Sequence, residues 1–335
     1  MPLYPLFSDF QELREKNFAA VQAYISRQGD ARADRWTLYH PAMRPMLDFS
    51  TGRAVPGDRL EHMLEQQKRM EAMNVKGFRD WHFYDNIFFQ SADPHKFIVQ
   101  GLGKGVDVRF QNQEHEHIDH YIHTFYLHDG KILHYSEVGN PMHEVHEFGI
   151  QPRLPHIPSF EALFEQTTNH DPTYPVQAEH APALRQKNIE TVVRYLSAPG
   201  PDRADRWRLF TEDCSYGVNH LPDDILRRAY GIDAVRRVQE GLARSFPNWV
   251  YWNLDLYFCE DPNYIIVRTD GDGVCVDYAE QPFKHDDRPF HSFHLKDGRI
   301  KDYRLYVNPM KLCQDMGWDF GFVFGAYGKP NDLGL

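Results

Sequence analysis

Glu137 is the carboxylate in this 335-residue chain whose surroundings best suit proton transfer. It stands in a predicted strand together with Tyr135, Val138 and Gly139. A carboxylate enclosed by apolar side chains is expected to have a raised pKa, because burial disfavours the charged form, and it then serves as a general acid or base near neutral pH. The alternative is a surface glutamate on a half-exposed strand.

Two arginines occupy the same local sequence in different parts of the chain. Arg35 and Arg206 each follow a predicted helix and precede a tryptophan. A guanidinium in this place can hold a carboxylate or phenolate through two hydrogen bonds. Each arginine could equally form an ion pair with the preceding aspartate, Asp34 or Asp205.

The stretch 114–123 is the most polar predicted strand and holds four histidines. Strand alternation puts most of its metal-ligating side chains on one face and a single histidine on the other. The first face holds His115, His117, Asp119 and His123, and the second holds His120. A metal site is one interpretation, although the ligands lack a second supporting element. Solvated or dimer-facing histidines are the other.

Two further residues are candidates for hydrogen bonding to a substrate. A two-residue turn at 129–130 would place Ile122 opposite Glu137 and His120 diagonally beside it on the same face, and a bulge would exchange these assignments. Tyr84, close after Trp81, could donate a hydrogen bond to a substrate oxygen, or it could be an ordinary structural tyrosine.

Composition excludes several classes of protein. Acidic residues outnumber basic ones by 48 to 37, so the net charge of −11 offers no basic footprint for nucleic acid and argues against anionic membranes. We see no signal peptide and no apolar run near the roughly 18 residues of a membrane span. The four cysteines form no close pair, and the glycines at 103–105 fit neither nucleotide-binding pattern. We therefore expect a cytoplasmic enzyme or binding protein without a metal, flavin or nicotinamide cofactor.

The second half of the chain repeats landmarks of the first half in the same order. Five of them are displaced by 168 residues: 93–94 to 261–262, 103–105 to 271–273, 123 to 291, 129–130 to 297–298, and 140–142 to 308–310. Earlier, Arg-Ala-Asp-Arg-Trp occurs at both 32–36 and 203–207. Such constant spacing indicates a duplicated unit.

We predict a domain over 1–150, a proline-rich linker over 151–182, and a second domain over 183–335 that ends in a tail. In each domain, helical spacing of apolar residues comes first, and strands joined by Asp-Gly hairpins follow. This order is typical of an α+β fold.

The motifs of the second copy resemble the PhzA/PhzB proteins of phenazine biosynthesis. They are Arg-Trp-Arg-Leu-Phe, Phe-Pro-Asn-Trp, Glu-Asp-Pro-Asn, Gly-Asp-Gly, His-Ser-Phe, Asp-Gly-Arg-Ile-Lys and Asn-Pro-Met. The resemblance extends over both copies, residues 10–150 and 180–316. It implies two nuclear transport factor 2-like cones, in which helices pack on a curved antiparallel sheet, related to ketosteroid isomerase and SnoaL-like cyclases. It also implies an internal pseudodimer formed sheet to sheet. A homodimer of the whole chain is a further option.

The resemblance also implies roles for individual residues, because the family condenses two amino-ketone rings with a glutamate, an arginine and a helix histidine. By position the glutamate is Glu137 in the first copy and Leu305 in the second. The arginine is Arg35 or Arg206.

The helix histidine of the family has no certain counterpart in either copy. Val238 matches it in the second copy, and Met70 or Gln67 in the first, with His62 about two turns earlier. We therefore predict a catalytic set and a substrate-binding set. The catalytic set is Glu137, Arg35, His120 and Tyr84, and the binding set is His62, Met70, Trp81, Tyr39, Tyr135 and Arg206.

The resulting expectation is a cofactor-independent acid/base enzyme acting on a small aromatic or cyclic compound. A lyase or isomerase is favoured, for example one that abstracts a proton and eliminates a small fragment. The first domain should carry the chemistry and the second should be mainly structural. The alternatives are a phenazine-type condensing enzyme with one inactive copy, and a non-catalytic pseudodimer that binds a small molecule.

Overall fold

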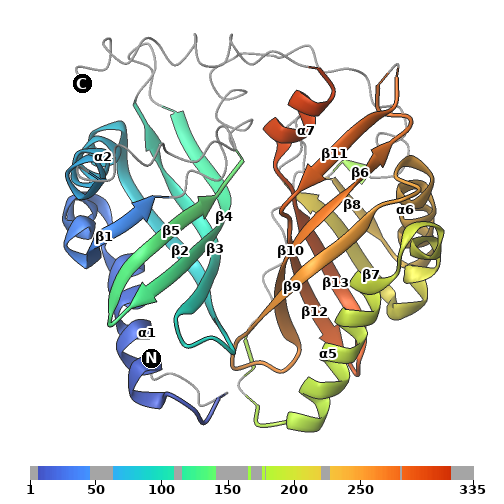
Figure 1. Ribbon diagram of the computed structural model, residues 1–335, viewed down its shortest axis with the longest axis horizontal. Coiled ribbons are helices and arrows are strands. Elements are labelled where there is room, and N and C mark those ends of the chain that lie inside the picture. The colour runs from blue at the N-terminus through green and yellow to red at the C-terminus, as the bar shows by residue number, and fades with distance from the viewer. Residues whose placement is uncertain are drawn as a thin grey trace. The chain divides into compact units, whose positions relative to one another are not determined.

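The chain separates into two compact units, Met1–Ile150 and Gln151–Leu335 (Figure 1). The computed structural model describes residues 7–45, 63–108, 115–140, 165–166, 176–177, 179–219, 227–279 and 281–317. His62, most of the predicted linker and the C-terminal tail lie outside the described residues.

The first unit is a five-stranded sheet with helices on one face (Figure 1). Its strands are ordered β1-β5-β4-β3-β2, and all neighbours are antiparallel except β1 and β5, which are parallel. The elements in chain order are α1 (Gln11–Ser26), the 3-10 helix η1 (Gly29–Leu38), β1 (Tyr39–Pro45), α2 (Met63–Gly77), β2 (Phe78–Ser91), β3 (Lys96–Asp107), β4 (His115–His128) and β5 (Lys131–Val138).

The second unit repeats this plan with some additions. Its main strands follow the order β9-β10-β12-β13-β7, extended by β8 and β6, and β11 pairs with β10. The elements are β6 (Glu165–Gln166), α5 (Pro182–Ser197), η3 (Gly200–Leu209), β7 (Phe210–Asn219), β8 (Arg227–Tyr230), α6 (Ile232–Ser245), β9 (Val250–Phe258), β10 (Tyr264–Cys275), β11 (Phe283–Asp287), β12 (Phe290–Lys296), β13 (Arg299–Tyr306) and α7 (Pro309–Asp315).

The predicted α+β fold in two tandem units is confirmed. Each sheet is antiparallel except for one pairing, because β1 joins β5 in parallel and β7 joins β13 in parallel. β1 contains Pro41 and Pro45, which are tolerated in an edge strand. The same prolines interrupt the alternating pattern by which a strand is recognised in sequence. The partner of β1 lies far along the chain, and local periodicity carries no information on such a pairing.

The repeated residues at the start of each unit tie the first helix to two turns of the sheet. Arg14 on α1 donates to the carbonyl oxygens of Ser91 at 2.9 Å and Ala92 at 2.6 Å. Asn17 donates to the carbonyl of Pro94 and accepts from the backbone N–H of Gly130, both at 2.9 Å. This sequence motif therefore has a structural role.

The Asp-Gly turns are hairpins, as predicted. Asp129 and Gly130 have φ angles of 49° and 74°, and Asp297 and Gly298 have 53° and 81°. Positive φ at both central residues matches the right-handed twist of the flanking strands.

The glycine pair at 103–105 serves packing. A Cβ atom added at Gly103 would lie 2.4 Å from the Trp81 ring, and one at Gly105 would lie 2.8 Å from the same ring. The glycines on β3 thus let the indole cross the sheet closely. Gly271 and Gly273 accommodate Trp249 in the same way.

The core of the first unit lies between its helices and the sheet. It is built from apolar side chains of α1 and of alternating positions on β2 to β5, among them Phe18, Val21, Trp81, Phe83, Phe97, Phe125 and Leu127. The four cysteines of the chain are buried and free. In the described ranges, no helix is both long and apolar enough to cross a membrane.

A buried ion cluster in the second unit yields a stability prediction. Asp302 accepts from Arg228 Nη1 at 2.7 Å and from Arg304 Nε at 2.9 Å, and all three side chains are at least 95% buried. Asp302→Ala removes a counter-charge that two buried guanidiniums share and should lower the free energy of unfolding by about 3–5 kcal/mol.

Urea denaturation of both variants and the parent protein measures this effect. The matched control is Asp205→Ala, because the Asp205–Arg208 pair is two-thirds exposed and should contribute little. Equal losses in the two variants would contradict the importance of the buried cluster.

Candidate functional site

A chain of three polar side chains links β4 to β5 in the first unit. Tyr135 donates its hydroxyl hydrogen to Glu137 Oε2 at 2.7 Å. His123 Nδ1 lies 2.9 Å from the same hydroxyl and 3.4 Å from Glu137 Oε2. Because the phenol has one hydrogen and gives it to the carboxylate, Nδ1 of His123 acts as the donor toward Tyr135.

Glu137 differs from the expected buried carboxylate of high pKa. Burial works to raise its pKa, but the interactions with His123, the hydrogen bond from Tyr135 and the charge of Arg35 outweigh burial, so the pKa lies below the ordinary value. The side chain also keeps 41% of its surface exposed. A carboxylate that is flanked by protein and partly open to solvent can contact a ligand.

Glu71 is a second carboxylate of this site, and the sequence analysis missed it. It lies on α2 with 2% exposure and accepts a hydrogen bond from Gln67 Nε2 at 3.0 Å. Burial raises its pKa, and the charge of Glu137 adds to the shift, while Arg35 opposes it. The signal that could have found it is the comparison of the copies, because residue 71 aligns with Gln239 at the common displacement.

Two buried arginines of η1 supply the positive charge of the site. The guanidinium of Arg35 lies 4.4 Å above the Tyr24 ring and donates to the Arg27 carbonyl at 2.8 Å. Arg32 donates to the carbonyls of Phe78 and Asn74. Burial and the neighbouring charge of Arg35 lower the pKa of Arg32 to about 10, so both side chains remain cationic at neutral pH. The suggested pairing of Arg35 with Asp34 is replaced by these contacts.

The register of β4 and β5 explains why His120 does not join the site. A bulge between Tyr126 and Leu127 shifts the pairing, so that His123, and not Ile122, lies opposite Glu137. His120 is three positions from His123 and therefore lies on the other face of β4. Our expected arrangement, which had no bulge, is wrong at this point.

Tyr84 also lies away from the site. The Phe83 ring is 4.5 Å from that of His123, so Phe83 points toward the site, and Tyr84 points to the opposite face of β2. Lys104, Asp85 and Glu116 are its electrostatic neighbours there.

The predicted binding residues fall in several places. Tyr39 accepts from Gln67 at 3.2 Å and so belongs to the polar cluster, as does Tyr135. Trp81 is buried on the same face of the sheet and stacks on His117 at 5.6 Å. Met70 is half-buried on α2, and Arg206 belongs to the second unit.

The aspartate of the histidine-rich strand braces the backbone. Asp119 accepts from the N–H of His120 at 2.7 Å and from that of Asn140 at 2.6 Å. Asp287 repeats both contacts with Arg288 and Asn308. In the part of the chain that the structure describes, no group of three potential ligands is placed to hold a metal ion.

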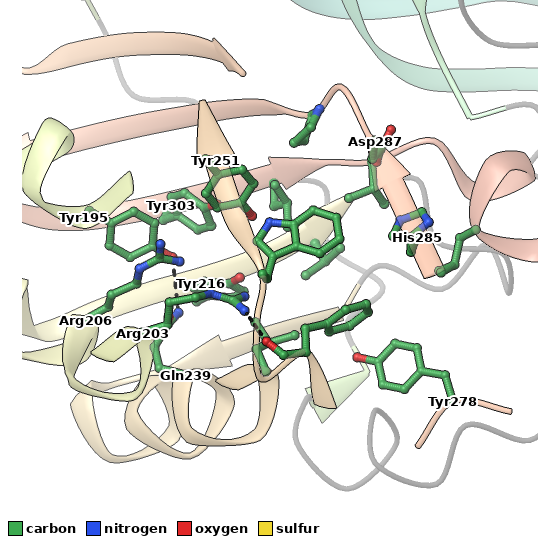
Figure 2. Close-up of a pocket in the computed structure, with 18 residues that line it drawn as sticks. Tyr195, Arg203, Arg206, Tyr216, Gln239, Tyr251, Tyr278, His285, Asp287 and Tyr303 are labelled. Carbon is green, nitrogen blue, oxygen red and sulfur yellow. Dashed lines mark hydrogen bonds between the residues drawn. The ribbon is translucent and has the colours of Figure 1, made fainter. Parts of the chain in front are cut away.

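A cavity lies in the second unit, at the position that corresponds to the cluster of the first (Figure 2). It holds about 700 Å³ of space free of protein atoms, including open solvent at its mouth. Five tyrosines line it, together with Arg203, Arg206 and Trp249. Figure 2 shows the arginines at one end and His285 with Asp287 at the other.

The second unit keeps the aromatic and basic frame but lacks both carboxylates. His291 Nδ1 lies 2.7 Å from the Tyr303 hydroxyl, as His123 does from Tyr135. Leu305 lies opposite His291 in the sheet, where the first unit has Glu137. Gln239 stands for Glu71 and donates to the Tyr195 hydroxyl at 3.2 Å.

Comparison with known proteins gives consistent results. PhzA2 of Pseudomonas aeruginosa, a phenazine biosynthesis protein, is 34% identical over 136 residues, which are 40% of this chain and 83% of that protein. PhzB of Pseudomonas fluorescens is 31% identical over 134 residues, which are 40% of this chain and 83% of that protein. The crystal structure of a phenazine biosynthesis-related protein of P. aeruginosa is 31% identical with a TM-score of 0.40, covering 43% of this chain and 88% of that one.

The family model for phenazine biosynthesis protein A/B matches this chain twice, over residues 4–158 and 171–320. The two matches together cover most of the chain and coincide with the two copies of the repeat. The chain therefore belongs to the phenazine biosynthesis protein A/B family and carries the family's domain in tandem.

Proposed function

We propose that the first unit is the catalytic half of a cofactor-independent acid/base enzyme, a lyase or isomerase acting on a small cyclic or aromatic compound. The observation that supports this most is a pair of electrostatically coupled carboxylates whose pKa values are displaced in opposite directions. The pKa of Glu137 is lowered and that of Glu71 is raised. Such a separation gives one site a base and an acid at the same pH.

Glu137 is the base in this proposal. It is ionised, and its exposed surface is open to a ligand. A substrate that covers this surface removes water from the carboxylate and so raises its affinity for a proton. Tyr135 and His123 hold the side chain in place.

Glu71 is the acid, because burial favours its protonated form. Arg35 interacts electrostatically with both carboxylates and would stabilise negative charge that develops on the substrate. His120 and Tyr84 have no part in the proposal, since they lie on the other face of the sheet.

A phenazine-type condensation remains the second candidate, and membership of the family favours it. The family's reaction also needs a second titrating group on the long helix. No histidine occurs in α2, but Glu71 lies directly after Met70 and could take that role.

Glu137→Gln should reduce turnover by about 10²–10⁴-fold, because the amide keeps the volume of the side chain and loses the proton-transfer function. The measurement is the steady-state rate with a substrate found by screening small cyclic compounds. The control is Glu116→Gln, which changes an exposed glutamate of β4 and should leave the rate unchanged. Full activity in Glu137→Gln would refute the assignment.

Glu71→Gln should change the pH dependence of stability. In the unfolded chain the pKa of Glu71 is about 4.3, and in the folded chain it is higher, so the folded chain keeps the Glu71 proton to higher pH. The stability that this proton contributes is lost as the pH rises from the unfolded pKa through the folded pKa. The variant should therefore be more stable than the parent above the raised pKa and equal to it below pH 4.

Urea unfolding at pH 4 and pH 8 measures this difference. Glu65→Gln, an exposed change on the same helix, is the control and should show no such dependence. If Glu71→Gln is less stable than the parent at pH 8, the ionised carboxylate of Glu71 does not cost stability and the prediction is wrong.

A further inference from the structure

We propose that the cavity of the second unit is a separate binding site for a single-ring aromatic anion, a carboxylate or phenolate, which it holds without proton transfer. This goes beyond the proposed function, because it assigns a ligand to the unit that lacks the catalytic carboxylates.

Two buried arginines give the cavity a positive charge. Arg203 and Arg206 line it and are 5% and 4% exposed. Arg203 donates to the carbonyl of Phe246 at 2.9 Å, and Arg206 to those of Leu196 and Ala198 at 3.2 and 3.0 Å. These acceptors are neutral, so neither guanidinium has a carboxylate partner in the described part of the chain. Two buried like charges without a counter-charge are costly, and an anionic ligand would supply one.

The hydrogen-bonding groups make the same point. Arg203 Nε, Arg206 Nε and Trp249 Nε1 are buried and have no partner in the structure. All three atoms are donors, and all three residues line the cavity. Unsatisfied buried donors are rare in folded proteins, so three around one cavity indicate that an acceptor is missing.

The walls determine the rest of the ligand. Tyr195, Tyr216, Tyr251, Tyr278 and Tyr303 line the cavity together with Trp249. Burial raises the pKa of Tyr195, Tyr216, Tyr278 and Tyr303, so these phenols stay neutral and do not compete as anions. A flat ring that carries one negative group fits this lining.

Proton transfer is not expected here. Leu305 and Gln239 replace the two carboxylates. Burial and the charge of Arg206 hold the pKa of His291 well below its usual value. His285 is engaged with Asp315 at 2.8 Å. Burial raises the pKa of Asp287, but its carboxylate accepts from two backbone N–H groups and lies at the end of the cavity away from the arginines (Figure 2).

Isothermal titration of the full chain with benzoate tests the proposal. Benzoate should bind at one site per chain. Benzamide, which has the same shape without the charge, and inorganic phosphate, which has charge without the ring, should each bind at least tenfold more weakly. Equal affinity for benzoate and benzamide, or no binding of millimolar benzoate, would overturn the proposal.

Titration of the Leu305→Glu variant shows whether benzoate binds in this cavity. This substitution restores a carboxylate next to Arg206 and should abolish benzoate binding without removing either arginine, whereas unchanged binding would overturn the proposal. Arg206→Met should have the same effect, and Arg208→Met, an exposed change on the same 3-10 helix, should have none. Glu137→Gln should leave benzoate binding intact while it lowers turnover, so failure of this proposal and failure of the proposed function are distinguishable.

Discussion

The burial of two arginines under one 3-10 helix is the constraint on which each unit depends. Arg32 and Arg35 in the first unit, and Arg203 and Arg206 in the second, are at least 95% buried. Their guanidiniums bond mainly to backbone carbonyls, which hold them in place without neutralising them. A buried charge is costly unless an opposite charge lies near it. The group that supplies this opposite charge in each unit therefore affects which ligands its site can bind.

The two units share the same aromatic and basic side chains but differ in the residues that can balance the charge of the buried arginines. The histidine and tyrosine that lie beside each other on neighbouring strands occur in both units, and so does the arginine stacked on a helix tyrosine. The first unit adds Glu137, whose pKa is lowered, and Glu71, whose pKa is raised by burial, whereas the second has Leu305 and Gln239. Glu137 therefore supplies negative charge near Arg35 in the first unit, whereas Arg203 and Arg206 have no carboxylate partner in the described part of the second unit.

Much of this could be predicted from the sequence, because constant spacing reveals a repeat and Asp-Gly reveals a hairpin. Glu137 and Arg35 were proposed from their local sequence and from the family resemblance, and the structure places them within electrostatic reach of each other. His120 was placed on the wrong face relative to Glu137 because a bulge between Tyr126 and Leu127 shifts the pairing of β5 with β4 by one residue. No local sequence pattern predicts this bulge. Glu71 was missed because a polar residue in an amphipathic helix resembles a solvated one until the facing elements are known.

Glu137 and Glu71 of the first unit should keep an aromatic anion out of its site, because Leu305 and Gln239 stand at these positions in the second unit. The benzoate stoichiometry of the double variant Glu71→Gln, Glu137→Leu tests this, because the variant gives the first unit the side chains of the second at both positions. Isothermal titration should show two benzoate sites per chain in this variant. A stoichiometry that stays at one would contradict the account, because charge balance would then not be what separates the two units.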